Sequence, residues 1–105
     1  MLVFLYRWRL KPGLEDQFVE SWSAITRYYR DNAGSLGSRL HKGNDGIWYA
    51  YAQWHSPGDR EQAFDQIPDH PARERLQEAI DEFLGETVLD IRSDLLAALP
   101  ITDEN

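Results

Sequence analysis

The 105-residue sequence predicts an α+β fold, a ferredoxin-like βαββαβ sandwich in which two helices cover one face of an antiparallel four-stranded sheet. Three observations lead to this prediction. Strand-like and helix-like hydrophobic patterns follow in the order strand, helix, strand, strand, helix, strand. A Gly-Asn-Asp-Gly turn joins the two middle strands as a hairpin. No linker divides the chain, so residues 1–99 are expected to form one domain, followed by a flexible tail at 100–105.

Hydrophobic spacing defines the first strand and the first helix. Residues 2–10 alternate with the period of a strand, and Lys11-Pro12-Gly13 ends it. A helix is expected over about residues 14–32, where apolar side chains recur every three or four positions. These are Leu14, Phe18, Trp22, Ile25 and Tyr29. Gly34 is a suitable stop because glycine readily adopts positive φ.

The middle of the chain is predicted to form two strands, over residues 35–42 and 47–55. The turn at residues 43–46 is compatible with a loop of two or of three residues. The two loops place different side chains opposite each other, and the sequence leaves this register open.

The second half is expected to supply two further helices and the last strand. A short helix is predicted near residues 60–66 and an interruption at 67–69. Another helix is expected to begin at His70-Pro71, because proline is well tolerated at a first helical position. Its apolar stripe would be Ala72, Leu76, Ala79, Ile80 and Phe83. Gly85 would end it, and the last strand would lie within residues 86–96.

Apolar side chains occupy both faces of the predicted strands. Val3 and Leu5 alternate with Phe4 and Tyr6, and tyrosines alternate with tryptophans in the third strand. Two helices cover only one face, so the other would expose a large apolar patch to water. We therefore predict a homodimer in which two such faces pack together.

Composition excludes several classes of protein. Eleven basic and 18 acidic side chains give a net charge of -7, which argues against a nucleic-acid or anionic-membrane partner. The chain has no cysteine, which removes disulfides and thiol catalysis. No apolar run is long enough to span a bilayer and the N-terminus lacks a signal-peptide pattern, so a cytoplasmic location is expected.

An aromatic-walled pocket above the sheet is the first candidate site. The side chains of Trp48, Ala50, Ala52 and Trp54 share one side of the third strand, and the two small residues leave room between the large ones. The further candidate wall residues are Tyr6, Trp8, Trp22 and Tyr29. Such a pocket suits a planar, hydrophobic aromatic ligand. The alternative is that helix side chains such as Trp22 fill the room as ordinary core.

Charged residues in strands are the second kind of candidate. Arg39 and Arg92 lie within predicted strands, where an unpaired charge is costly. Either arginine is a candidate for stabilising a phenolate or enolate, and an Arg92–Asp90 ion pair is the structural alternative. His70 is a candidate general base or a helix cap. The three histidines have no metal-site spacing, so no metal is expected.

Several of these features occur together in one known family. A strand running into Lys11-Pro12-Gly13 precedes a long helix, and Gly34-Ser35-Leu36-Gly37-Ser38-Arg39-Leu40-His41 precedes the turn. The segment Trp48-Tyr49-Ala50-Tyr51-Ala52-Gln53-Trp54 follows, and then a short helix with Ala63-Phe64. Over about residues 1–96 the chain resembles the antibiotic biosynthesis monooxygenase family of the dimeric α+β barrel fold. The resemblance implies a homodimer, with a cavity between sheet and helices in each protomer.

The resemblance implies chemistry as well. Some family members oxidise polycyclic phenolic substrates with dioxygen and without metal or flavin, so no cofactor is expected. Trp54 matches the family tryptophan that lines the cavity at the end of the third strand. The haem-degrading branch uses an asparagine and a histidine, whose positions fall here on Tyr6 and on Arg75 or Leu76. These departures disfavour haem cleavage.

The first hypothesis is therefore a cofactor-independent monooxygenase acting on an aromatic, polycyclic or quinol-like small molecule. Trp54 and Tyr6 would wall the site, and Arg92 or Arg39 would favour the substrate anion. The alternative is a non-catalytic dimeric binding protein with the same pocket, and a haem-degrading enzyme is the third hypothesis.

Overall fold

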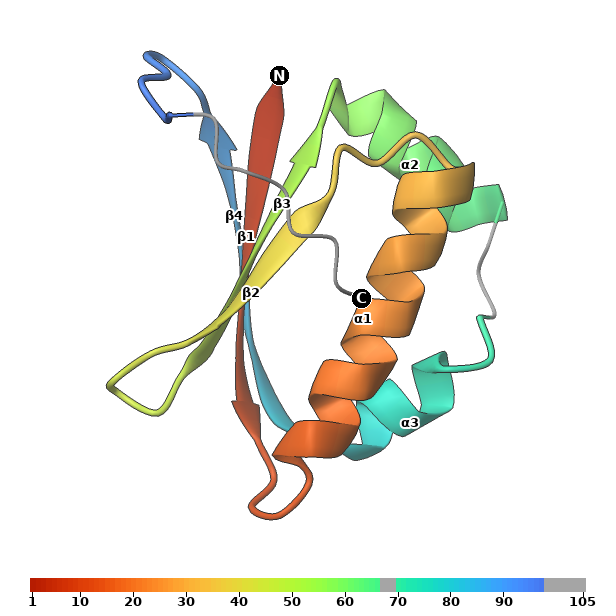
Figure 1. The fold of residues 1–105 in the computed structure, drawn as a ribbon, viewed down its shortest axis with the longest axis vertical. Coiled ribbons are helices and arrows are strands. Elements are labelled where there is room, and N and C mark those ends of the chain that lie inside the picture. Colours follow the sequence, from red (N-terminus) through yellow and green to blue (C-terminus); the bar gives the residue numbers. More distant parts are fainter. Residues whose placement is uncertain (67–69, 98–105) are drawn as a thin grey trace.

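The computed structural model describes residues 1–66 and 70–97, which form one sheet with helices on one face (Figure 1). In chain order the elements are β1 Leu2–Leu10, α1 Glu15–Asn32, β2 Ser38–Lys42, β3 Trp48–Trp54, α2 Pro57–Gln66, α3 Arg73–Glu78 and β4 Ile80–Asp90. The strand order is β2-β3-β1-β4 and every neighbouring pair is antiparallel. This architecture confirms the predicted ferredoxin-like fold. The predicted interruption at 67–69 and the predicted tail at 100–105 lie outside the described residues.

The first half matches its prediction closely. β1 has the predicted bounds, and α1 buries Phe18, Ile25 and Tyr29 from the expected stripe. The helix ends where the Ala33 N–H donates to the Tyr29 carbonyl, and Gly34 follows at φ +81°. None of the helices in the described ranges is both long and apolar enough to cross a membrane.

The hairpin between β2 and β3 has a three-residue loop, which settles the open register. The Gly43 N–H donates to the Ile47 carbonyl at 2.7 Å, and Gly46 adopts φ +81°. This is the pattern of a turn followed by a left-handed glycine. Leu40 therefore lies opposite Ala50 on the helix side, while Arg39 lies opposite Tyr51 on the open side.

The prediction for the second half is wrong at the junction between the last helix and the last strand. The helix expected to run from His70 to Gly85 ends at Glu78, and β4 begins at Ile80 rather than Glu86. The reason is tertiary, because residues 80–90 pair along the whole length of β1. β4 has two residues more than β1 (11 against 9), and two register shifts absorb them. Gly85, expected as a helix stop, lies in β4 at φ +108° beside the first shift.

The start of α2 also differs from the prediction. The helix begins at Pro57, three residues before the expected Arg60. Ser56 explains the earlier start, because its Oγ accepts a hydrogen bond from the Asp59 N–H at 3.2 Å, as a helix cap does. The extra turn brings Arg60 inside the helix rather than at its end.

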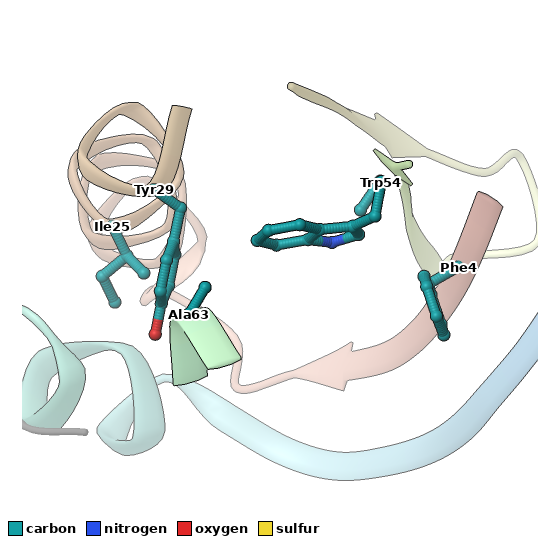
Figure 2. Close-up of a cluster of buried hydrophobic side chains, with 6 residues drawn as sticks. Phe4, Ile25, Tyr29, Trp54 and Ala63 are labelled. Atoms are coloured by element: carbon teal, nitrogen blue, oxygen red, sulfur yellow. The ribbon is translucent and has the colours of Figure 1, made fainter. Parts of the chain in front are cut away.

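The core lies between the helices and the sheet, in two clusters of buried side chains. The first cluster contains Phe4, Ile25, Tyr29, Ala52, Trp54 and Ala63. Figure 2 shows the Trp54 ring extending from β3 toward Tyr29 on α1, with centroids 6.3 Å apart. The second cluster contains Trp8, Phe18, Ala50 and Ala79. In Figure 1, α1, α2 and α3 all lie on one side of the sheet, and no helix of the described residues covers the opposite face.

Candidate functional site

A cavity of about 520 Å³ lies between the helix-covered sheet face and the helices. Its size falls within the range of small-molecule sites. Strands, loop and helices all contribute to its wall, which is formed by Tyr6, Trp8, Trp22, Ile25, Thr26, Tyr29, Ser35, Ser38, Ala52, Trp54, Phe64, Arg73, Leu76, Gln77, Ile80 and Phe83. Seven of these 16 residues are aromatic, so the wall suits a flat, polarisable ligand.

Six of the candidate residues come together in this wall. They are Tyr6, Trp8, Trp22, Tyr29, Ala52 and Trp54. Trp54 is only 3% exposed and contacts the rings of Tyr29 and Phe64 edge-on. Trp22 forms part of the wall, so it bounds the space above Ala52 rather than filling it.

Trp48 and Ala50 share the predicted strand face but lie outside the cavity wall. Phe18 from α1 explains the difference. It is fully buried, clusters with Ala50 and packs its ring edge against Trp48 at 6.4 Å. The helix therefore fills the end of β3 that the sequence left open, and the cavity begins at Ala52.

The two arginines proposed to stabilise an anion lie on the opposite side of the sheet. Arg39 faces the open side opposite Tyr51, and Arg92 follows β4 rather than belonging to it. Both border a second hollow of about 780 Å³ on the open face. The structural alternative was an ion pair between Asp90 and Arg92 on one strand face. Because β4 ends at Asp90, Arg92 lies beyond the strand and the two residues do not share a strand face. Within one protomer neither arginine reaches the aromatic cavity.

His70 makes its contacts within the fold and lies outside the cavity wall. Its Nδ1 accepts a hydrogen bond from the Ala72 N–H at 3.0 Å, just before α3. Its ring packs edge-on against Tyr28 at 5.5 Å. It does not line the cavity. Among the described residues no group of three or more His, Asp or Glu side chains is arranged to hold a metal ion.

Arg73, on α3, is the charged residue that the structure brings to the cavity. Its Nη2 donates to the Tyr29 hydroxyl at 3.3 Å. Its Nε is buried and has no hydrogen-bond partner within the described ranges. Among the described wall residues there is no carboxylate and no imidazole, so the wall has one positive charge and an unpaired donor. A ligand oxygen that carries negative charge would be attracted to this positive charge.

The helical spacing of Arg73 in the sequence could have indicated that it lies at the cavity. It lies three residues before Leu76 and four before Gln77, both of which line the cavity, so the three share one helix face. The prediction of a buried cation was based on strand positions alone, and it therefore missed an arginine on a short helix.

The sequence-based prediction also did not include Arg60, which lies on α2. Its Nη1 donates to the Tyr6 hydroxyl at 2.8 Å, and both terminal nitrogens contact the Glu86 carboxylate at 3.2 Å. Burial raises the pKa of the Tyr6 phenol above its ordinary value, and the adjacent Arg60 charge offsets part of that rise. Tyr6 is therefore a neutral hydroxyl at the cavity wall at neutral pH.

A family model described as antibiotic biosynthesis monooxygenase matches residues 1–85. No curated protein matches the chain. SnoaB of Streptomyces nogalater, a cofactor-independent oxygenase, is similar in structure with a TM-score of 0.74 at 14% identity, covering 90% of this chain and 95% of SnoaB.

Two further solved structures show the same fold. Rv0793 of Mycobacterium tuberculosis has a TM-score of 0.72 at 14% identity, with 90% of this chain and 98% of Rv0793 covered. A conserved protein of Methanosarcina mazei has a TM-score of 0.70 at 12% identity, with 83% of this chain and 88% of that protein covered. At these identities the structural likeness establishes the fold.

Proposed function

Because the chain belongs to the antibiotic biosynthesis monooxygenase family, we propose that it is a cofactor-independent monooxygenase that oxidises an aromatic, polycyclic or quinol-like molecule with dioxygen. One observation carries the proposal. Arg73 is the charged side chain among the described residues that line the aromatic cavity of about 520 Å³. A fixed positive charge on an otherwise uncharged aromatic wall favours a ligand that binds as an anion. SnoaB, a cofactor-independent oxygenase of the same fold, supports the same reaction class.

The proposed reaction needs an electron-rich substrate anion in a dry site. A phenolic or anthrone-type substrate releases a proton to bulk water as it enters and is held as an anion by the Arg73 guanidinium. The anion passes electrons to dioxygen and a C–O bond forms, and the resulting peroxide anion takes up a proton from water and loses water. A CH₂ carbon thus becomes a carbonyl, with one oxygen atom in the product and the other in water. Trp54 and Trp8, both under 10% exposed, wall the ring system against solvent.

Oxygen uptake with anthrone tests this proposal. With the protein treated with a chelator and assayed at pH 6.5, we expect one dioxygen consumed per anthrone and anthraquinone as the product. A blank without protein measures autoxidation. Uptake no faster than the blank, or uptake that returns only when metal is added, would contradict the proposed reaction.

A non-catalytic binding protein is the second candidate, and one observation favours it. Within the described ranges no carboxylate or imidazole lines the cavity, so the wall supplies no conventional general base. The same assay separates the two candidates. Quenching of tryptophan fluorescence by anthrone without oxygen uptake would identify a binding protein.

We further propose a homodimer formed through the open sheet face. Leu5 lies opposite Tyr51 near the middle of this face, and Leu89, which pairs with Val3, is 40% exposed. Sedimentation is expected to give a dimer at low micromolar concentration. Leu5→Asp would place an unpaired charge in the interface and should raise the dimer dissociation constant at least about 100-fold.

Val19→Asp is the matched control for this prediction. Val19 is 37% exposed on α1, so the same kind of change occurs away from the open face. We expect this variant to remain dimeric. A monomeric wild-type chain, or equal dissociation of the two variants, would exclude the proposed interface.

A further inference from the structure

The Arg60 side chain lies behind Tyr6, outside the cavity wall that Tyr6 helps to form. Its guanidinium makes polar contacts on two sides. Nη1 donates to the Tyr6 hydroxyl at 2.8 Å, and Nη1 and Nη2 each contact one oxygen of the Glu86 carboxylate at 3.2 Å. Glu86 lies opposite Tyr6 in the β1–β4 ladder, so the sheet holds both partners of the arginine side by side.

Packing immobilises this guanidinium. Its central carbon lies 3.9 Å from the centroid of the Phe4 ring and 5.3 Å from that of Phe64. The Arg60 side chain is 18% exposed, against 52–53% for the arginines in the surface ion pairs at Arg9 and Arg30. A planar guanidinium that is both stacked and bidentate has little freedom to reorient. Tyr6 therefore meets a fixed donor.

The contact determines what the Tyr6 hydroxyl can do. An arginine side chain has hydrogen-bond donors and no acceptor, so the Tyr6 oxygen must accept the hydrogen bond from Arg60. The hydroxyl proton of Tyr6 therefore points away from Arg60. Tyr6 is neutral near pH 7, because the ordinary pKa of a tyrosine already lies well above 7 and burial raises it further. The side chain lines the cavity, where a ligand oxygen is the natural acceptor.

We propose that Arg60 is a positioning residue that holds Tyr6 as an oriented hydrogen-bond donor, so that the cavity selects ligands with a carbonyl or phenolic oxygen over hydrocarbons of the same shape. This inference rests on the proposed function of the cavity and defines the ligand class more closely. Arg60 and Arg73 have different tasks. Glu86 neutralises the Arg60 charge, so this pair orients a neutral donor, whereas Arg73 supplies the charge at the wall.

Binding of two probes to four proteins tests the inference. The probes are 1,8-dihydroxyanthraquinone, which carries oxygens, and anthracene, which has the same three-ring outline without them. Tyr6→Phe and Arg60→Met are each expected to weaken the oxygenated probe about 5- to 30-fold, as loss of one oriented hydrogen bond would. Anthracene should bind within about twofold of wild type in every variant. The double variant should bind no worse than Tyr6→Phe, because Arg60 acts through Tyr6.

The outcomes separate this inference from the proposed function. Two results would overturn the positioning role while leaving the cavity a ligand site. One is that Arg60→Met lowers the affinity for both probes equally. The other is that the affinity losses of the two single variants multiply in the double variant. A wild-type chain that binds neither probe would overturn both proposals. Arg60→Lys keeps a charge on α2, and Tyr6→Phe removes a single oxygen. If Arg60→Met fails to fold, these two variants test the positioning role instead. Arg60→Lys is then expected to keep part of the wild-type preference for the oxygenated probe over anthracene.

Discussion

Arg73→Gln is expected to lower the rate of anthrone oxidation about 100- to 1000-fold, the usual effect of removing a preorganised donor to a developing oxyanion. Arg73 lines the cavity, and its buried Nε has no partner within the described residues. Loss of the guanidinium leaves the substrate anion facing aromatic walls. Steady-state oxygen uptake measures the change. Arg73→Lys, which keeps the charge but loses the planar fork, should give an intermediate rate.

Arg75→Gln is the matched control, because Arg75 lies on the same helix but is exposed. Its rate should stay within about twofold of wild type. The pH dependence gives a second readout. Raising the pH ionises the substrate in solution, so the rate of Arg73→Gln should recover relative to wild type as pH rises. A rate for Arg73→Gln equal to that of Arg75→Gln would exclude the proposed role of Arg73.

Trp54→Ala is expected to have the largest combined effect on stability and function. Trp54 is 3% exposed and packs against Tyr29, Phe64 and the buried cluster around Phe4. Truncating a buried tryptophan costs about 3–5 kcal/mol in the free energy of unfolding. In a chain of this size that lowers Tm by at least about 12 °C. The variant should also lose probe binding, because the same ring walls the cavity.

Trp54→Phe separates the two effects. A smaller aromatic ring keeps much of the packing, so the loss of unfolding free energy should be well below that of Trp54→Ala. Urea unfolding measures stability, and oxygen uptake below the transition of each variant measures function. Unchanged turnover in folded Trp54→Ala would show that the cavity is not the site of reaction.

Local patterns predicted the first two-thirds of the fold well. β1 and α1 follow from periods of two and of three to four residues, which local backbone geometry dictates. The turn at 43–46 followed from glycine and asparagine chemistry, although its register depends on the tertiary structure. The junction of α3 and β4 was mispredicted because the spacing of Leu76, Ala79, Ile80 and Phe83 suits a helix. Pairing with β1 overrides that local preference.

The aromatic wall was predictable from the sequence, and the charges around it were not. Side-chain alternation groups Tyr6 with Trp8 along β1 and Ala52 with Trp54 along β3, and the β1–β3 register places both pairs on the same face of the sheet. Arg60 and Arg73 lie on short helices, and their approach to the cavity depends on how α2 and α3 pack above the sheet. No local pattern encodes that packing, so the sequence indicated strand arginines instead.

The sequence by itself determined the fold class, the two-faced apolar sheet and the identity of most aromatic wall residues, because each depends on spacing along one element. Only the tertiary structure decided where the cavity begins, through Phe18 above Ala50, and which cationic side chains lie beside it. It places Arg73 at the wall and Arg60 behind Tyr6, and it places Arg39 and Arg92 beside the hollow on the open face. The physical reason is that a site joins residues from separate elements, and their distances are set by packing between elements rather than by spacing within any of them.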